Sequence, residues 1–509
     1  MQEQDSFKKR YAFKILTNLI GFPLGLISQS IIPRALGPVA YGNFTFLTDF
    51  FSQVVNFFDA GTSIGFYVKL SQRQKEQELL RFYWNFILLV TLLLVLAVIG
   101  VIVIGKQDLF WPGQQIKFIG MGVFFALLAW FSEISLKVVD AHGLTKKGEI
   151  ARLLQRIIGF FLLLLMFYFQ RFSLTEFFLY NYATVILLIA FWWKILGRSG
   201  IHLFPAIRLP FALLRKYIIE FYHYAAPLIV YSLVGLATGV LDRWFLQKFS
   251  GSVEQGFYGL SYQIGAVCFL FTMAMTPLIT REFSIAYGEK DFEKMRYYFQ
   301  RFIPMLYSIA AFLSVFIMLQ ADKVALIMGG ESFKGSSMAI AIMALYPIHQ
   351  TYGQLSGSVY YATGKTKLFR NIGIIMMLVS LPFTFLILAP SALHGLNLGS
   401  TGLAAKMVLF QFITVNVQLW FNCKFLQLPF LKFLLHQFYS VAILGGCAYA
   451  AAFIADLFSA TTIISFVLSG IIYCFSISLL LIVMPGLFST SRVELMNQLA
   501  AIKKTLVPL

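Results

Sequence analysis

The chain has 509 residues, of which 59% are hydrophobic and 12% are charged. Soluble domains carry about 25% charged residues, so this composition excludes an ordinary soluble protein. The formal net charge is +18, because the chain holds 40 lysines and arginines but only 22 acidic residues. Apolar segments of roughly 20 residues recur from end to end, which indicates a bundle of helices in lipid.

Fourteen membrane-spanning helices are expected. In chain order they are 11–33, 41–69, 82–104, 116–139, 151–169, 175–196, 223–247, 257–279, 301–320, 337–361, 371–389, 401–422, 437–457 and 461–484. The second is long, and we expect it to break near Asp59-Ala-Gly-Thr62, with Asp59 capping the helix that follows. The predicted fold class is all-α integral membrane.

The basic residues predict which side of the membrane each loop occupies. When the loops are assigned alternately to two sides, 31 of the 40 lysines and arginines fall on the side of the N-terminus. Short loops rich in these residues stay in the cytoplasm, so both termini are expected there. Attraction to anionic lipid headgroups then accounts for the net charge, and no nucleic-acid partner is expected.

Three short patterns recur in the same order about 215 residues further along the chain. Arg34-Ala-Leu-Gly37 before PVAYGNF is echoed by Lys248-Phe-Ser-Gly251 before SVEQGFY. The matched positions are Gly37 and Gly251, Arg81 and Arg296, and Gly143 and Gly364. Each repeat holds six expected spans, an even number, which predicts two parallel lobes around a central cavity. The expected domains are 1–196, a cytoplasmic linker 197–222, 223–425, and two extra helices with a tail in 426–509.

Polar residues share helix faces in four expected spans. The faces are Asn18, Gly25 and Gln29; Thr45, Asp49, Gln53 and Asn56; Tyr231, Thr238 and Asp242; and Tyr346, Gln350, Gly353, Gly357 and Tyr361, with Gln354 beside them. These faces predict a hydrophilic cavity. The alternative is hydrogen bonding between helices, worth about 0.6 kcal/mol per bond. For Asp49 the cavity is favoured, because a carboxylate in lipid needs water or a partner.

Several charged residues allow two interpretations. Arg34 and its counterpart Lys248 either anchor helix ends at the headgroups or contact a phosphate near the outer mouth. Asp242 and Arg243 project about 100° apart on a helix, so they need not pair with each other. His349 is either a hydrogen-bonded packing residue or a proton carrier. Glu133, Lys137 and Asp140 are expected to form a local ion-pair ladder.

No catalytic arrangement is expected. The sequence has no Ser-His-Asp set in an accessible segment, no His cluster with metal-ligand spacing and no Walker loop after Gly329-Gly330. The outer loops are too short for a catalytic domain. We therefore expect a protein that is not an enzyme and has no cofactor, driven by a gradient or by consumption of its product; whether protons or sodium couple to transport is left open.

Six short motifs lie in or next to the expected spans: Ile32-Pro-Arg-Ala-Leu-Gly-Pro38, Tyr41-Gly-Asn-Phe44, Ala226-Pro227, Asp242-Arg243-Trp-Phe-Leu246, Gly256-Phe-Tyr-Gly-Leu-Ser-Tyr262 and Ala362-Thr-Gly-Lys-Thr-Lys367. They resemble motifs of the polysaccharide biosynthesis flippases, the Wzx-type members of the multidrug/oligosaccharidyl-lipid/polysaccharide (MOP) exporter superfamily. The resemblance covers roughly residues 8–425. It points to the polysaccharide branch of the superfamily, not to a particular substrate.

The resemblance implies alternating access and an oligosaccharide carried on undecaprenyl diphosphate across a bacterial inner membrane, for O-antigen, capsule or exopolysaccharide. Its implied partners are membrane lipids, this lipid-linked oligosaccharide and other polysaccharide assembly proteins. Arginines would bind the diphosphate, and tyrosines would offer stacking faces to sugars. The candidate substrate-binding residues are Arg34, Asp49, Gln53, Asn56, Tyr231, Asp242, Arg243, Tyr346, His349, Gln350 and Gln354.

Three alternatives stay open. The fourteen expected spans are shared with lipid II flippases of the same superfamily, so a peptidoglycan precursor is a second cargo. A multidrug exporter is another. A membrane-embedded polysaccharide polymerase or ligase is less favoured, because the outer loops offer only scattered acidic and His residues.

Overall fold

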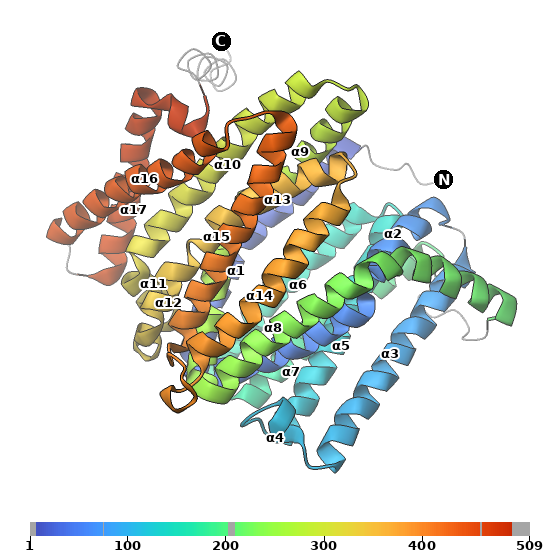
Figure 1. Ribbon diagram of the computed structural model, residues 1–509. Coiled ribbons are helices and arrows are strands. Elements are labelled where there is room, and N and C mark those ends of the chain that lie inside the picture. The colour runs from blue at the N-terminus through green and yellow to red at the C-terminus, as the bar shows by residue number, and fades with distance from the viewer. Residues whose placement is uncertain (1–6, 75, 202–208, 459–460, 491–509) are drawn as a thin grey trace, which may run out of the picture. The chain divides into compact units, whose positions relative to one another are not determined.

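The computed structural model describes residues 7–74, 76–201, 209–458 and 461–490, and every regular element in these ranges is helical (Figure 1). Helices satisfy all their backbone hydrogen bonds internally, which a chain in lipid requires. Ten helices in the described ranges are long and apolar enough to cross a membrane. The expected all-α membrane fold is confirmed, and the count of fourteen spans stays a prediction.

The chain divides into two compact units, Met1–Gly256 and Phe257–Leu509. Helices that begin in the first unit are α1 (Phe7–Asp59), α2 (Thr62–Gln72), α3 (Gln77–Val103), α4 (Gln107–Phe110), α5 (Ile116–Ala141), α6 (Thr145–Tyr168), α7 (Leu174–Arg198) and α8 (Phe211–Val267). Those of the second are α9 (Leu270–Gly288), α10 (Phe292–Leu319), α11 (Ala321–Gly329), η1 (Glu331–Ser336), α12 (Ser337–Met343), α13 (Tyr346–Ala362), α14 (Thr366–Leu388), η2 (Ser391–Leu393), α15 (Gly399–Leu426), α16 (Phe430–Phe458), α17 (Thr462–Val483) and η3 (Pro485–Phe488). The expected boundaries at residues 196, 222 and 425 stay predictions.

Two long helices each join a pair of expected spans at one glycine. Gly37 breaks α1 at φ 73° and ψ 167°, and Gly251 breaks α8 at φ 78° and ψ −173°. Only glycine adopts this backbone conformation readily. We expected loops between the spans at both places, and the structure instead continues the helix directly after the kinked residue. The third pair of the sequence repeat, Gly143 and Gly364, also has positive φ, at 74° and 70°.

The predicted break near Asp59 is confirmed. Helix α1 ends at Asp59 and α2 begins at Thr62. The Asp59 carboxylate accepts hydrogen bonds from the Ser63 backbone N–H at 3.2 Å, from the Ser63 hydroxyl at 2.7 Å and from the Tyr83 hydroxyl at 3.1 Å. These bonds satisfy donors at the start of α2 and tie the break to α3.

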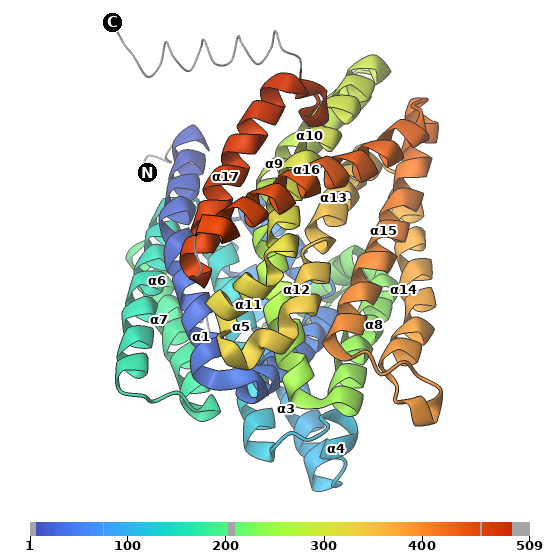
Figure 2. The same cartoon turned by 90° about the vertical axis from the view of Figure 1, so that its left-hand side faces the viewer.

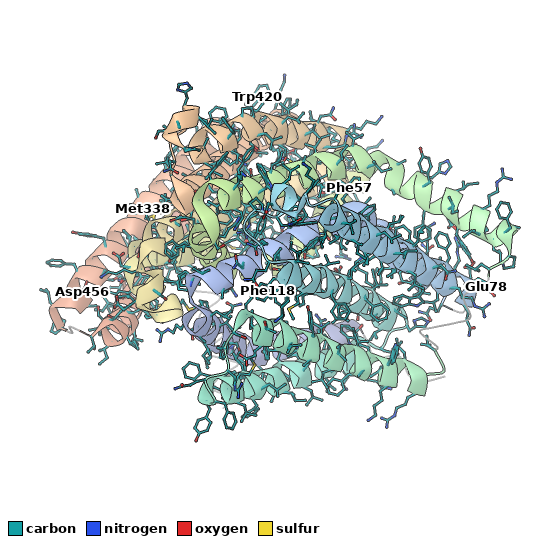
Figure 3. The ribbon with its side chains drawn as sticks, turned by 90° about the horizontal axis from the view of Figure 1, so that it is seen from below. Phe57, Glu78, Phe118, Met338, Trp420 and Asp456 are labelled. Carbon is teal, nitrogen blue, oxygen red and sulfur yellow. The ribbon has the colours of Figure 1, made fainter. Side chains whose placement is uncertain are left out.

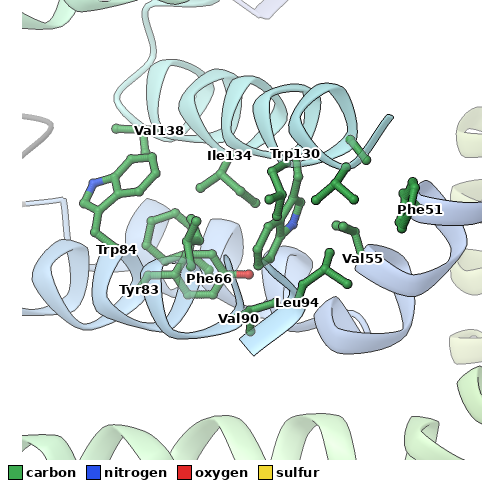
Figure 4. Packing of buried hydrophobic residues seen from close by; sticks show 14 of the residues in the cluster. Phe51, Val55, Phe66, Tyr83, Trp84, Val90, Leu94, Trp130, Ile134 and Val138 are labelled. Atoms are coloured by element: carbon green, nitrogen blue, oxygen red, sulfur yellow. The ribbon is translucent and has the colours of Figure 1, made fainter. Parts of the chain in front are cut away.

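Aromatic packing forms the core of the first unit (Figure 4). The rings of Phe66 from α2 and Tyr83 from α3 stack with their centroids 4.1 Å apart. Trp84 and Trp130 are buried beside them, where α3 meets α5. The opposite face of α3 exposes a run of apolar side chains: Leu88, Leu92, Leu96, Ile99 and Val103. A membrane helix presents such a face to lipid.

In the second unit the two extra C-terminal helices lie beside α10 (Figure 2). The Tyr473 ring of α17 stacks on Phe312 and Phe316 of α10, with centroids 5.0 and 5.4 Å apart. At one end, Lys323 of α11 pairs with Asp456 of α16 and donates to Ser465 of α17 at 2.8 Å. Large apolar side chains elsewhere, such as Trp420, point outward from the helices (Figure 3).

Candidate substrate-binding site

An arginine from α8 and an aspartate from α1 form the charged centre of the first unit. Arg243 is 9% exposed, and its Nη2 pairs with Oδ2 of Asp49. Its Nη1 donates to Oε1 of Gln255 at 3.0 Å, and the Gln255 amide donates back to the Arg243 carbonyl. The side chain of Asp49 is 45% exposed. The buried cation is therefore fixed by Gln255, while its carboxylate partner lies at an accessible edge.

This arrangement suits reversible anion binding. A guanidinium presents five N–H donors in a plane and matches phosphate or carboxylate oxygens two at a time. Asp49 and Gln255 each occupy one end of the Arg243 guanidinium. An incoming anion could displace the half-exposed Asp49 while Gln255 keeps the guanidinium in place. The expectation that Arg243 need not pair with the adjacent Asp242 stays a prediction.

A neutral polar cluster lies nearby, on the same two helices and on the segment that follows α4. Oδ1 of Asn43 accepts hydrogen bonds from Ser252 at 2.5 Å and from Gln114 at 2.8 Å. The Gln247 amide donates to Ser252 at 3.0 Å and to the Pro112 carbonyl at 3.1 Å. The cluster joins α1, the segment after α4 and α8. Sequence analysis missed it, because side chains from three distant segments meet only in the fold.

Two glycines let α1 and α8 approach closely at this cluster. A Cβ added to Gly42 would overlap the Ser252 carbonyl oxygen, and one added to Gly256 would overlap the carbonyl oxygen of Pro38. Gly42 and Gly256 hold equivalent places in the sequence repeat, each five residues after its kinked glycine. The repeat therefore supplies both the breaks and the close crossing.

The remaining candidates of the first unit lie on α1 and α8 as well. Gln53 lies against Gly239, where an added Cβ would be 3.0 Å from Cδ of Gln53. Asp242 is buried. The other three candidates are exposed: Arg34, Asn56 and Tyr231. Their predicted role in substrate binding stays a prediction.

Four candidates lie on α13 in the second unit. Oε1 of Gln354 accepts a hydrogen bond from Thr276 of α9 at 3.1 Å, and Gln350 accepts one from Gln411 of α15. The His349 ring meets Phe412 edge-on at 5.0 Å between centroids, and its Nδ1 has no hydrogen-bond partner in the described part of the chain. Tyr346 lies 6.5 Å from Tyr262, ring to ring.

The polar face of α13 is thus partly used to hold helices together. Two further hydroxyl pairs join α9 to α13: Thr272 with Thr351 at 2.8 Å and Thr280 with Ser358 at 2.7 Å. This is the interhelical bonding that we weighed as the alternative to a cavity. Gln354 takes part in it.

Sequence analysis also missed a buried lysine. Lys406 lies on α15 and is 2% exposed. Its signal was a single cation inside the expected span 401–422, where an ionisable residue marks a functional or paired position. Of the expected ladder on α5, Glu133 and Lys137 pair at 2.8 Å, but Oδ1 of Asp140 has no hydrogen-bond partner in the described ranges. In those ranges no group of three or more His, Cys, Asp or Glu residues could hold a metal.

Comparisons with known proteins agree with this architecture. A family model described as polysaccharide biosynthesis protein matches residues 7–283, and a second, MatE, matches residues 227–386. No curated protein sequence matches the chain.

Three solved structures illustrate the shared fold. The lipid II flippase MurJ in an inward closed conformation has a TM-score of 0.64 at 14% identity, covering 92% of this chain and 98% of that one. An inward-facing MATE family multidrug resistance transporter of the MOP superfamily has a TM-score of 0.62 at 14% identity, covering 82% and 98%. A MOP superfamily transporter from Pyrococcus furiosus has a TM-score of 0.51 at 16% identity, covering 83% and 97%.

Proposed function

The chain belongs to the polysaccharide biosynthesis protein family, as a multi-pass membrane transporter of the MOP superfamily, and from that premise we propose that it flips polyprenyl-diphosphate-linked oligosaccharide units between leaflets. The proposed setting is a bacterial inner membrane, with both chain termini in the cytoplasm. The proposed cycle is alternating access, and the oligosaccharide would serve surface polysaccharide synthesis. On this account the chain is not an enzyme.

The observation that carries this proposal is the buried guanidinium of Arg243, held by Gln255 on one side and Asp49 on the other. It lies inside the range that the polysaccharide family model matches. A diphosphate offers paired oxygens that a guanidinium binds with charge-assisted hydrogen bonds. Ionisable residues inside membrane bundles commonly mark substrate pathways.

The cargo also needs groups for sugar hydroxyls. In the first unit, the amide of Gln53 could exchange hydrogen bonds with hydroxyls. Tyr231 is exposed and offers a ring face on which a sugar could stack. These residues support an oligosaccharide headgroup, and they would be poorly suited to an apolar drug.

A lipid II flippase is the second candidate. The fold of MurJ matches 92% of this chain, including the part that follows the polysaccharide family match. Its cargo also carries a polyprenyl diphosphate, so the Arg243 centre serves either proposal equally. The sugar, and not the phosphate, has to distinguish them.

The experiment compares how fast the protein moves three different cargos between leaflets. Purified protein in liposomes would be offered fluorescent polyprenyl-diphosphate oligosaccharide, fluorescent lipid II and a cationic dye. We expect faster leaflet exchange of the first cargo than of the other two. Preference for lipid II would move the chain to peptidoglycan synthesis, and uptake of the dye alone would make it a drug exporter.

A further inference from the structure

Helix α6 carries an arginine at its centre. Arg156 is the twelfth residue of the 24-residue helix Thr145–Tyr168, which is long and apolar enough to cross a membrane. Its side chain is exposed, and in the described part of the chain it forms no ion pair and donates no hydrogen bond. Arg152, one turn earlier, is different, because it pairs with the buried Glu149.

The length of the helix puts Arg156 inside the hydrocarbon. The apolar run from Ile157 to Tyr168 is about 18 Å long at 1.5 Å per residue. The hydrocarbon core is about 30 Å thick, which leaves about 12 Å beyond this apolar run. The residues that precede Ile157, with Arg156 the last of them, must cross that remainder. The Glu149 and Arg152 pair that shares this depth is neutral as a unit. Arg156 alone adds a net positive charge there.

The neighbouring helix fixes where the guanidinium lies. Arg156 packs over Gly21 of α1, and a Cβ added to Gly21 would overlap Nη1 and come within 3.2 Å of Cδ. Gly21 precedes the break at Gly37 by about 24 Å of helix, which is again within the hydrocarbon thickness. One turn further along α1, Gly25 has no atom within 4 Å of an added Cβ, so the surface beside the guanidinium is open.

An isolated cation at this depth is costly unless water or an anion reaches it. We propose that Arg156, seated on Gly21, binds the phosphate of an isoprenoid-diphosphate lipid in the leaflet where α1 begins. This contact rests on the proposed function and adds an entry site to it, on α6 and on the part of α1 that precedes Gly37. Charge-assisted hydrogen bonds to such a ligand contribute enough to change affinity tenfold or more when lost.

Two matched pairs of variants test this site. Arg156→Ala removes the cation, while Lys147→Ala removes an exposed cation from the first turn of the same helix. Gly21→Ala keeps every charge but displaces the guanidinium, while Gly25→Ala adds the same methyl group into open space. Arg156→Lys keeps the charge without the planar fork of donors.

The measurement is binding of polyprenyl diphosphate to the protein in phosphatidylcholine nanodiscs, with phosphatidylglycerol as competitor. We expect the Kd to rise at least tenfold for Arg156→Ala and to rise clearly for Gly21→Ala. The Kd of Arg156→Lys should lie between those of wild type and Arg156→Ala, and both controls should keep the wild-type Kd. Wild-type binding that Arg156→Ala leaves unaltered would overturn this site and leave the proposed transport intact. Absence of wild-type binding would overturn both. Equal competition by phosphatidylglycerol would reassign the site to ordinary phospholipid.

Discussion

Gly37 in α1 and Gly251 in α8 share one backbone conformation that is essentially closed to other residues, at φ 73° and ψ 167° and φ 78° and ψ −173°. The two breaks place the helical segments that follow them against each other. Gly42 then meets Ser252, and Gly256 meets Pro38, at distances that exclude any side chain. The sequence repeat is thus a repeated piece of backbone geometry.

The kinked glycines should not tolerate alanine. Gly251→Ala forces a Cβ into a backbone region that costs about 1–3 kcal/mol, so the apparent Tm should fall. Gly235→Ala is the control, because Gly235 lies in regular helix of α8 with nothing within 4 Å of an added Cβ. That change should be neutral or slightly stabilising. The apparent Tm of each variant would be measured by thermal unfolding in detergent, followed by tryptophan fluorescence. Equal Tm values for Gly251→Ala and wild type would mean that the backbone at the break adjusts to a side chain without losing stability.

The close crossing of α1 and α8 should be more sensitive still. Gly42→Ala places a methyl group onto the Ser252 carbonyl, and backbone cannot swing aside as a flexible side chain does. We expect the helices to separate and the hydrogen bonds around Asn43 to be lost, with poor recovery of folded protein by size-exclusion chromatography. Normal recovery and an unchanged Tm for Gly42→Ala would show that the crossing is not a tight contact.

Local features of this fold could be predicted, and contacts between distant segments could not. The repeated glycines and the Asp59 cap depend on residues next to one another, so their sequence pattern was sufficient. The pairing of Asp49 with Arg243 was not predicted, since helical spacing shows which residues share a face but not which faces meet. Gln255 was missed because residues between the expected spans 223–247 and 257–279 were treated as a loop.

Removing the buried cation should affect transport more than removing exposed ones. Arg243→Ala takes away the proposed phosphate ligand and leaves Asp49 without its cation, so we expect at least a tenfold slower leaflet exchange. Arg34→Ala should also slow exchange, by a smaller factor. Lys248→Ala, which removes an exposed cation from α8, should have little effect. Similar small decreases in the exchange rate for all three variants, with unchanged Tm values, would mean that these residues only anchor the helices in the membrane.

An ion-pair network at the start of α8 should make stability depend on pH. Partial burial raises the pKa of Glu220, but hydrogen bonds from Lys69 and Arg73 outweigh it and hold that pKa below its usual range. A lowered pKa contributes stability above the ordinary glutamate value of about 4.3, and this contribution is lost as pH falls through the lowered pKa. Glu220→Gln should therefore lower the apparent Tm at pH 7.

The difference in Tm between wild type and Glu220→Gln should shrink as the pH is lowered below about 4. The control is Glu331→Gln, which removes an exposed carboxylate with no ion pair in the described part of the chain. Its Tm should follow wild type at every pH. A Glu220→Gln difference that stays constant from pH 7 to acid would assign the effect to packing and not to charge.

The central claim is that this chain moves a polyprenyl-diphosphate oligosaccharide between leaflets, and leaflet exchange in liposomes measures that movement directly. Fluorescent cargo in the inner leaflet would be followed as it becomes accessible to an external quencher, with an active flippase and protein-free vesicles alongside. We predict exchange by wild-type protein well above protein-free vesicles, and a strongly reduced rate for Arg243→Ala. Wild-type exchange no faster than protein-free vesicles, while the active flippase works, would contradict the account.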